Sequence, residues 1–407
     1  MNILIVNQYA GSPELGMEFR PYYLAQEWGK MGHHPVVVTG DFSHLRQKNP
    51  RAIRDFEEKT VEGVRYCFLK TPAYAGNGLG RVKNVFAFCR KLYSGAARLA
   101  KTYRPDVVIA SSTHPFDGRG AARIARIAKA KLIYEVHDLW PLSPMELYGY
   151  KAGHPLIHLI RREVRRLSRK SDGVVSILEK ADLYLASIGA SPKNYQHIPN
   201  GVDFREEPEN LPPKKHQELL ELLHSRGHFV LLYLGGFSAA NALEDLVFAA
   251  ALAPPGIAFV LMGDGPYKNE LRSRAKKLRL DNLYFLDPAP KGEATALLPM
   301  ADALYLGAKR SPLYQYGVGM NKLFDYLLSG RPILYGVAGA GNLVERSGCG
   351  LTLPPEDPRA IVEGAKALLA LSPEERAELG KRGKDYVRDH HRYDRLAKEY
   401  IDYLTGL

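Results

Sequence analysis

The chain has 407 residues, of which 45% are apolar and 25% are charged, and its three cysteines stand far apart in the sequence. This length exceeds one ordinary hydrophobic core, so we expect two domains in a soluble globular protein. The lack of a Cys-x-x-Cys pair argues against a structural zinc site and favours a reducing compartment. No apolar run approaches the roughly 20 residues that span a bilayer. The opening MNILIV lacks the basic region of a signal peptide, so we expect a cytoplasmic protein.

The formal net charge of +12 is unevenly distributed along the chain. Residues 1–203 contain 30 Lys and Arg against 18 Asp and Glu, whereas residues 204–407 contain 26 of each kind. Such an excess in one half suggests an anionic partner, which could be a nucleic acid, a membrane surface or a phosphorylated substrate. The densest cluster, RREVRRLSRK at 161–170, is equally compatible with a solvated helix face.

Apolar runs of strand length alternate with helical patterns along nearly the whole chain. Strands separated by helices of about 10 to 15 residues predict βαβ units and parallel sheets. The expected strands are 3–6, 35–40, 106–111, 131–136 and 173–177 in the first half, and 228–235, 257–263, 282–287, 302–307 and 332–337 in the second. The alternation breaks at the polar, proline-containing stretch 205–228, which is the expected linker. The fold class is therefore α/β, with a doubly wound parallel sheet in each half and a cleft between them.

In doubly wound sheets, ligands bind beyond the carboxyl ends of the strands, so the loops at those ends should carry the chemistry. Glycines follow three of the expected strands, at 11–16, 235–236 and 263–265. The chain contains no GxGxxG, GxxxxGK[ST] or GxSxG sequence. This argues against a dinucleotide oxidoreductase, a P-loop ATPase and a serine nucleophile elbow.

Residues 314–332, YQYGVGMNKLFDYLLSGRP, predict a glycine-rich approach to a helix. From Asn321 the apolar residues recur at helical spacing, Gly330 ends the pattern, and Pro332 opens the next strand. Asp325 lies inside the apolar face, one turn from the helix start. It is either a surface acid or a residue that holds a ligand.

The first half has a polar loop of its own, IYEVHDLWPLSP at 133–144. A strand that ends with His137 and Asp138 places a donor and an acceptor at the mouth of the expected cleft. In the alternative reading, Asp138 caps the next segment and His137 only packs.

Together these segments resemble the family 4 retaining glycosyltransferases, which have the GT-B architecture, and the resemblance covers nearly the whole chain. The segments similar to general features of that family are 15–40, IPNGVD at 198–203, GDGP at 263–266 and MADALYLG at 300–307. EVHDLWP at 135–141 and NKLFDYLLSGRP at 321–332 resemble the bacterial branch that contains N-acetylfucosamine transferases for surface polysaccharides.

The resemblance implies two Rossmann-like domains, 1–204 for the acceptor and 205–385 for the nucleotide sugar. A C-terminal helix near 386–407 is expected to pack back on the first domain. The implied reaction moves a sugar, with retention, from a nucleotide diphosphate sugar to a glycan or a polyprenyl-diphosphate-linked acceptor, and nucleic acid is not a partner. We expect a UDP-linked donor, with an N-acetylated sugar as one candidate. No cofactor or metal is implied, because helix amides and cationic side chains would stabilise the departing diphosphate.

Carried over residue by residue, the resemblance assigns Asp325 to the ribose hydroxyls, the amides of 319–322 to the diphosphate, and His137 to the donor sugar or its phosphate. Gly16 would let the first loop approach the diphosphate closely. The implied catalytic residues are His137, Asp138 and Asp325. The implied donor-binding residues are Gly16, Gly236, Asn241, Asp264, Lys309, Arg310, Gly319, Met320, Asn321, Lys322 and Asp325, and the implied acceptor-binding residues are Glu18, Arg20, His114 and Trp140.

Three positions depart from the family pattern. The first glutamate of the family falls on Gly317, and its usual basic pair falls on Gly236 and Asn241. A diphosphate leaving group needs positive charge, for which Lys309, Arg310 and Lys322 are the candidate sources. The alternative function is a non-catalytic subunit of the same fold that binds nucleotide sugars or acts as a scaffold.

The basic first half suggests a peripheral contact with the inner face of the plasma membrane. Residues 81–104 interleave aromatic and basic residues, as an interfacial helix does. The alternative is that Phe86, Phe88 and Tyr93 belong to the core.

Overall fold

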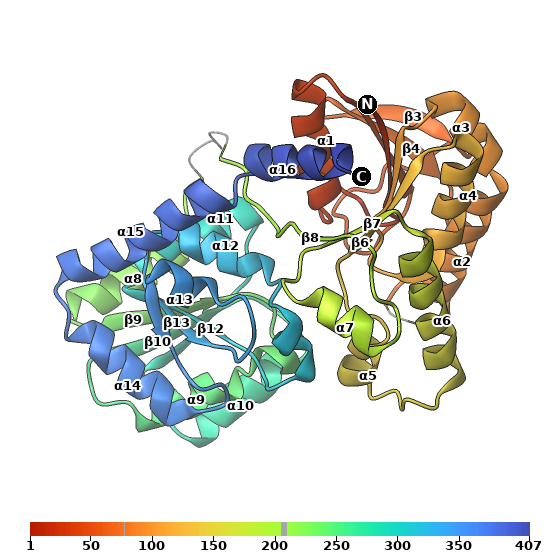
Figure 1. Cartoon of the computed structure of the whole chain (residues 1–407). Helices are drawn as coiled ribbons and strands as arrows, with labels where there is room; N and C mark the ends of the chain where they lie inside the picture. The colour runs from red at the N-terminus through yellow and green to blue at the C-terminus, as the bar shows by residue number, and fades with distance from the viewer. Residues whose placement is uncertain (77, 205–209) are drawn as a thin grey trace. The chain divides into compact units, whose positions relative to one another are not determined.

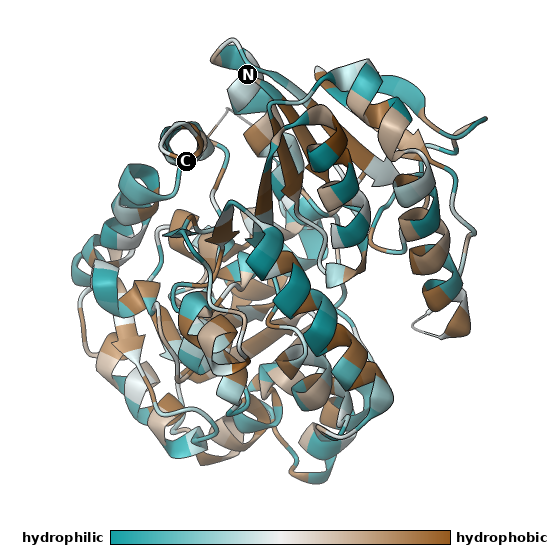
Figure 2. Ribbon diagram, turned by 45° about the vertical axis from the view of Figure 1, so that its right-hand side comes forward, coloured by the Kyte–Doolittle hydropathy of each residue, from teal (hydrophilic) through white to brown (hydrophobic). Residues whose placement is uncertain are grey.

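The computed structural model describes residues 1–76, 78–204 and 210–407 (Figure 1). The chain divides into two compact units, one formed by Met1–Asp203 with Tyr393–Leu407 and the other by Phe204–Arg392. Each unit has its own sheet and its own apolar core. In Figure 2 the strands of these sheets are coloured as hydrophobic, as expected for strands that helices cover on both faces.

The first unit contains an eight-stranded sheet with the order β3-β4-β2-β1-β5-β6-β7-β8. Every neighbouring pair is parallel except β3 and β4. The strand order reverses direction at β1, so the loops after β1 and β5 flank the switch point where doubly wound sheets bind ligands. The strands are β1 Asn2–Val6, β2 His34–Gly40, β3 Glu57–Val61, β4 Val64–Leu69, β5 Val107–Ala110, β6 Lys131–Val136, β7 Gly173–Ser176 and β8 Tyr195–His197.

Helices cover this sheet in two groups. Helices α1 and α16 pack together and share a core with the apolar residues on one face of the strands. Helices α2, α3, α4 and α6 pack against one another beside strands β4, β5 and β6 (Figure 1). The helices are α1 Arg20–Lys30, α2 Leu79–Ser94, α3 Ala96–Tyr103, η1 Pro115–Asp117, α4 Gly118–Ala128, α5 Leu142–Tyr148, α6 Pro155–Lys170, α7 Ala181–Ser187 and α16 Tyr393–Thr405.

The five strands expected in the first half are all present, and three further strands extend the sheet at its edges. Strands β3 and β4 form an antiparallel hairpin around Glu62 and Gly63. Strand β3 has the polar sequence EEKTV because it is an edge strand, half of whose residues face solvent. Such a strand lacks the apolar run on which the sequence prediction relied.

The second unit contains a six-stranded sheet with the order β11-β10-β9-β12-β13-β14, in which all neighbouring pairs are parallel. The order reverses between β9 and β12, so the loops after these strands flank the second switch point. The strands are β9 Phe229–Leu234, β10 Ile257–Met262, β11 Leu283–Leu286, β12 Ala303–Gly307, β13 Ile333–Gly336 and β14 Gly350–Thr352. The helices are α8 Lys214–Ser225, η2 Ala239–Asn241, α9 Glu244–Leu252, α10 Lys268–Lys277, α11 Lys291–Ala296, η3 Leu298–Met300, η4 Pro312–Tyr316, α12 Asn321–Leu328, α13 Leu343–Ser347, α14 Pro358–Leu369 and α15 Pro373–His390.

The expected linker at 205–228 is largely a helix. Helix α8 begins after Pro213 and buries Leu220 and Leu223 beside β9. The prolines that suggested a linker precede this helix, where proline is well tolerated. Residues 205–209 of the expected linker lie outside the described residues.

The expected helix near 386–407 is in fact the end of one helix and the whole of another. Helix α15 runs on to His390 and belongs to the second unit, whereas α16 begins at Tyr393 and belongs to the first. Helix α16 packs on α1, and the Trp28 indole Nε1 donates a hydrogen bond of 3.0 Å to the carbonyl of Ala397 (Figure 1). Among the described helices, none is long and apolar enough to cross a membrane.

Candidate active site

In the second unit, the loops after β9 and β10 pack backbone against backbone. A Cβ atom at Gly263 would lie 2.0 Å from the carbonyl oxygen of Gly235, and one at Gly265 would lie 2.5 Å from that of Phe237. Both glycines also have positive φ angles, 143° and 153°, which side chains rarely adopt. The glycines therefore bring two loops together, and Asp264 between them is exposed, with its carboxylate 4.0 Å from Lys268 Nζ.

Lys322 reaches from the first turn of α12 to the end of β9. Its Nζ lies 2.7 Å from Asn241 Oδ1 and 3.1 Å from the hydroxyl of Tyr233, whose ring centroid is 4.8 Å away. Asn241 in turn donates to the carbonyl of Gly236 at 2.7 Å. The cation therefore lies beside both positions, 236 and 241, from which the family's basic pair is missing. Within the described chain, no carboxylate oxygen lies within 4.0 Å of this Nζ.

Burial lowers the pKa of Lys322 to about 8, from an ordinary value near 10.5. An anionic ligand would reverse this shift, because a neighbouring negative charge favours the protonated amine. A bound anion would therefore make Lys322 hold its proton more tightly.

Helix α12 is fixed against β9 by a second residue on the same helix face. The hydroxyl of Tyr326 accepts from the amide of Leu234 at 2.7 Å and lies 3.1 Å from the carbonyl oxygen of that residue. Lys322 and Tyr326 are four residues apart and therefore share a face. Met320 precedes the helix without a side-chain cap, and exposed Gly319 leads into it, so the first amides of α12 point into an accessible loop.

Asp325 lies on α12 as expected but is not fully buried. Its side chain is 24% exposed, and Oδ1 lies 3.3 Å from Nζ of Lys291 at the start of α11. Partial burial raises the pKa of Asp325, and Lys291 counteracts this shift. Lys291 could not be paired with Asp325 from the sequence, because it follows a different strand, 34 positions earlier in the chain.

Lys309 and Arg310 are the other two cations expected to supply the positive charge that is missing at positions 236 and 241. Each makes contacts of its own. Arg310 donates its amide to the Glu356 carboxylate at 2.9 Å and its guanidinium to the Pro355 carbonyl at 3.3 Å. Lys309 is exposed, with its amide on the carbonyl of Ala240 at 3.0 Å. Gly317 has a φ of 136°, so the glutamate found there in the family would be strained in this backbone.

In the first unit, His137 belongs to a buried polar group that includes a residue missed in the sequence. Glu135 accepts from Arg20 Nε at 3.1 Å and Nη2 at 3.0 Å through one oxygen, and from Ser111 Oγ at 2.5 Å through the other. The second oxygen also lies 3.1 Å from His137 Nε2. Burial favours the neutral acid, but the charge of Arg20 and the hydrogen bond with His137 hold the pKa of Glu135 well below its usual range.

Arg20 is among the residues assigned to the acceptor, and its guanidinium is enclosed within the first unit. Only 3% of the side chain is exposed, and its remaining donors contact the carbonyls of Ile198 at 2.9 Å and Pro199 at 2.6 Å. The positive charge of Arg20 is therefore neutralised by partners within the first unit.

His114, also expected to bind the acceptor, is 5% exposed. Its Nε2 lies 2.5 Å from Gln8 Oε1, and its buried Nδ1 has no hydrogen-bond partner among the described residues. Burial and the charge of Arg81 lower the pKa of His114 to about 3, so the ring is neutral at ordinary pH. The side-chain amide nitrogen of Gln8 donates in turn to Asn84 Oδ1, at 2.6 Å.

The remaining expected residues of the first unit lie in the loops after β1 and β6. Trp140 is half-buried and donates to the carbonyl of Thr113, Asp138 is exposed, and Glu18 is half-buried with a pKa raised by burial. Gly16 is buried, and a Cβ atom there would lie 2.7 Å from the amide nitrogen of Gln47. The need for glycine at this position therefore arises within the unit itself.

Comparison with known proteins accounts for this arrangement. Residues 16–201 match the family described as glycosyl transferase 4-like domain, and residues 221–386 match glycosyl transferases group 1. The chain is 24% identical over 270 residues to a GDP-mannose-dependent alpha-(1-6)-phosphatidylinositol monomannoside mannosyltransferase of Mycobacterium tuberculosis, which covers 64% of this chain and 68% of that protein. It is 24% identical over 322 residues to the alpha-monoglucosyldiacylglycerol synthase of Streptococcus pneumoniae, covering 76% of this chain and 65% of that one.

Solved structures with the same fold include HepE of Anabaena in complex with UDP and glucose, at 16% identity and a TM-score of 0.67 over 100% of both chains. The sucrose-phosphate synthase of Thermosynechococcus elongatus has a TM-score of 0.71 at 17% identity, over 99% of this chain and 98% of that one. These likenesses show the GT-B fold that the sequence predicted. The likeness to N-acetylfucosamine transferases stays a prediction. The chain belongs to the family 4 type of glycosyltransferases, as an enzyme with a glycosyl transferase 4-like domain followed by a group 1 domain.

Proposed function

We propose that this glycosyltransferase moves a sugar from a nucleoside diphosphate sugar, with retention of configuration, to a glycan or lipid-linked acceptor in bacterial surface-polysaccharide synthesis. The observation that carries the proposal is the part-buried cation of Lys322, which has polar but no carboxylate neighbours in the described chain. A departing diphosphate is the ligand that such a cation fits, and the first turn of α12 adds its helix dipole.

The donor would bind with its nucleotide on the second unit. The diphosphate would contact Lys322 and the amides of 319–322, and Asp325 would accept hydrogen bonds from the ribose hydroxyls. Asp325 is suited to this because it is part-exposed and its carboxylate already has one partner, Lys291, which stabilises the charged form. His137 would contact the donor sugar or its phosphate from the first unit. The protein would act by positioning and electrostatic stabilisation, with the leaving phosphate oxygen taking the proton of the acceptor.

We propose UDP as the nucleotide, and an N-acetylated sugar as one candidate for transfer. HepE was crystallised with UDP, whereas the mycobacterial relative uses GDP-mannose, so both bases belong in the test. No metal ion is needed in this proposal, because Lys322 and the helix amides would neutralise the leaving group. Turnover is therefore expected to persist in EDTA.

The test is the release of nucleoside diphosphate from a panel of UDP- and GDP-sugars, with and without lipid-linked acceptors. Release that depends on Lys322 and Asp325 supports the proposal. Lys276→Met is the matched control, because it removes an exposed lysine of α10 that has no assigned role at the site. Release that survives both Lys322→Met and Asp325→Ala would show that the donor binds elsewhere.

A second function, a non-catalytic subunit that binds nucleotide sugars, is favoured by one observation. Asn241 and Gly236 replace two cations, and Lys322 is the cation that contacts Asn241 through its side chain. Tight nucleotide binding in titration calorimetry, with no release from any donor and acceptor, would support this second function.

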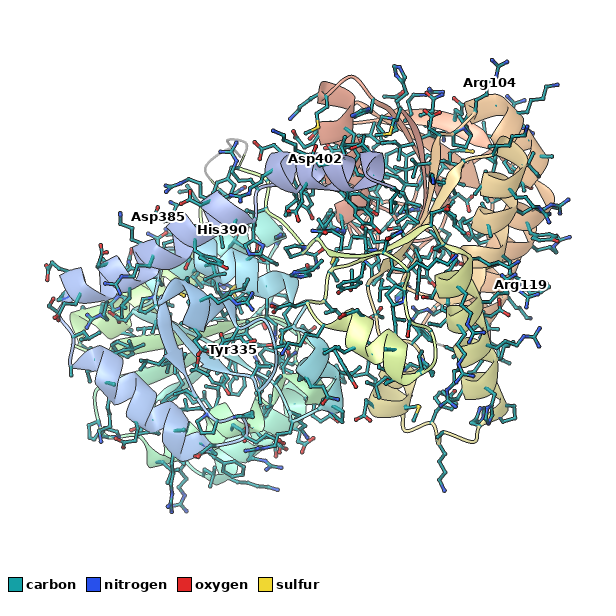
Figure 3. The ribbon with its side chains drawn as sticks, viewed as in Figure 1. Arg104, Arg119, Tyr335, Asp385, His390 and Asp402 are labelled. Carbon is teal, nitrogen blue, oxygen red and sulfur yellow. The ribbon has the colours of Figure 1, made fainter. Side chains whose placement is uncertain are left out.

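We further propose that the first unit contacts an anionic membrane from the cytoplasmic side. Helices α2, α3, α4 and α6 together contain 15 Lys and Arg and a single acid, Glu163. That acid is buried and paired with Arg119, whose side chain is labelled in Figure 3 on the outer side of this layer. Most of the excess charge of the chain is thus gathered on helices that pack together, which is the arrangement an anionic surface attracts.

Helix α2 also exposes apolar side chains in a row. Leu79, Val82 and Phe86 are 80%, 62% and 68% exposed, respectively, while Phe88 is buried. The expected aromatic residues therefore divide: Phe88 belongs to the core, whereas Phe86 is available to a bilayer interface. Flotation with vesicles that contain 30% anionic lipid, in about 50 and 500 mM salt, tests the contact. Equal flotation with neutral vesicles, or none at low salt, would contradict it.

A further inference from the structure

The carboxylate of Glu135 is buried at the centre of a hydrogen-bonded group. It lies next to the end of β6, two residues before His137, and only 2% of its side chain is exposed. One oxygen is occupied by two nitrogens of Arg20, and the other faces Ser111 Oγ and His137 Nε2. Because every lone pair direction has a donor, the carboxylate is held in one orientation.

Arg20 keeps this carboxylate charged. Two nitrogens of its guanidinium donate to one carboxylate oxygen, and the same guanidinium is anchored by the Ile198 and Pro199 carbonyls. An ionised carboxylate has no proton to give, so the groups around it must donate.

The need for hydrogen-bond donors around Glu135 determines which nitrogen of the His137 ring carries a hydrogen. Ser111 has one hydroxyl proton, which it gives to Glu135 at 2.5 Å. His137 Nε2 then faces two acceptors, Glu135 Oε2 at 3.1 Å and Ser111 Oγ at 3.0 Å. A deprotonated Nε2 would meet oxygen lone pairs from both sides, so the ring must carry a hydrogen on Nε2.

We propose that Glu135 is a positioning residue for His137, holding the neutral ring as the Nε2–H tautomer and leaving Nδ1 as the ring atom that meets the substrate. In that state Nδ1 is an acceptor, suited to a sugar hydroxyl that donates to it. The effect on transfer rests on the proposed function, whereas the tautomer itself does not.

Other charged groups face the same ring. Glu18 and Asp138 lie in the two loops beside it, and buried Asp117 also lies near it. None of these forms a hydrogen bond with His137 Nε2 in the described structure, where Glu135 and Ser111 occupy that atom. The orientation of the ring is therefore assigned to Glu135 and its partner Ser111.

The direct test is nitrogen-15 NMR of the whole protein labelled at histidine, recorded at about pH 8.5, where an ordinary imidazole is neutral. The His137 signals are identified by their loss in His137→Gln. We expect a protonated-type resonance from Nε2 and an unprotonated-type resonance from Nδ1. A protonated Nδ1 in the unaltered protein would overturn the proposal without any variant.

Two substitutions separate Glu135 from Ser111. Glu135→Gln offers the ring both an acceptor and a donor, and we expect a mixture of tautomers. Ser111→Ala retains the carboxylate, and we expect the Nε2–H form to persist. An unchanged tautomer in folded Glu135→Gln would overturn the role of Glu135. Since that variant leaves Arg20 buried without its counter-charge, Arg20→Met with Glu135→Gln is the replacement if the single variant does not fold.

The activity test distinguishes the two proposals from each other. With a donor that the protein turns over, Glu135→Gln is expected to lower kcat about 10- to 100-fold. The Kd for the free nucleoside diphosphate should change less than kcat, because most of the groups proposed to bind it, Lys322, Asp325 and the amides of 319–322, belong to the second unit. If no donor is turned over, the proposed function fails while the tautomer result stands. If kcat is unchanged although the tautomer is lost, the positioning role is wrong.

Discussion

The buried charges of the two units have different kinds of partner. In the first unit, Arg20 and Glu135 are 3% and 2% exposed, and two nitrogens of Arg20 donate to one oxygen of Glu135. In the second, Lys322 is part-buried beside Asn241 and Tyr233, and the carboxylate of Asp325 is a quarter exposed. Both groups lie at the carboxyl ends of parallel strands, near the switch points of their sheets.

The difference indicates two kinds of task. A fully paired charge has no capacity left for a ligand, so Arg20 and Glu135 can only hold other groups in place. A cation with neutral partners has lost solvation without gaining a counter-charge, which an anionic ligand supplies. Stability should therefore depend most on the first group, and nucleotide binding on the second.

The largest expected effect is on stability. Arg20→Ala leaves Glu135 buried without its counter-charge, and removing one partner of a buried pair costs about 3–5 kcal/mol. We expect the free energy of unfolding of the first unit to fall by that amount in urea titrations that follow Trp28. Glu363→Ala is the control, because Glu363 is 69% exposed in its pair with Lys366, and it should change stability by less than about 0.5 kcal/mol.

The same pair sets a dependence on pH. The folded-state pKa of Glu135 is depressed below that of the unfolded chain. Its contribution to stability is therefore fully present above the unfolded pKa of about 4.3 and is lost as the pH falls below that value. The stability difference between the unaltered protein and Arg20→Met with Glu135→Gln should shrink on acidification. A difference that grows instead would show that Glu135 is protonated in the folded protein.

The next effect concerns nucleotide affinity. Asp325→Ala removes the charged acceptor proposed for the ribose hydroxyls, a loss of about 1.5–3 kcal/mol, or roughly 10- to 150-fold in Kd. Titration calorimetry with UDP and GDP measures it, and Lys291→Met tests whether the neighbouring cation matters by itself. An unchanged Kd in folded Asp325→Ala would make the Asp325–Lys291 pair structural and contradict our placement of the nucleotide.

A smaller effect is expected from pH on the same binding. Since burial lowers the pKa of Lys322 to about 8, the amine loses its charge between pH 7 and 9, and nucleotide binding should weaken over that interval. The stability of the free protein should change in the opposite sense from pH 8 to 10, because the unfolded chain then binds the additional proton. Lys322→Arg keeps its charge throughout and should bind with little dependence on pH. If the unaltered protein and Lys322→Arg showed the same pH profile of binding, Lys322 would be excluded as the source of the pH dependence.

Much of the fold could be predicted because parallel strands are buried on both faces and leave continuous apolar runs. The runs at 3–6 and 257–263 became β1 and β10. The hairpin of β3 and β4 could not be predicted in this way, since the edge strand EEKTV is half polar. Helix α8 was hidden by prolines that in fact precede it.

The candidate site was predictable only where a residue lies on a recognisable segment. Asp325 and Lys322 follow from the pattern of α12, and His137 follows from the end of β6. The role of Glu135 could not be predicted, because the residues around it have the pattern of a buried strand. Its partner Arg20 comes from a helix 115 positions away. Contacts between such distant residues depend on the strand order, which one sequence does not specify.

The smallest effects test whether the basic helices of the first unit form the membrane contact. Lys83→Gln and Arg90→Gln on α2 remove exposed charges beside Phe86, and each is expected to weaken binding to anionic vesicles by about 1 kcal/mol, or roughly fivefold. Lys276→Gln and Lys277→Gln on α10 make the same change of charge in the second unit and should have no effect. Phe86→Ser should weaken binding even in high salt, because its contribution is apolar and is not screened. If the α10 variants weaken binding as much as the α2 variants, the attraction follows the net charge of the whole chain, and the basic helix layer is not a docking surface.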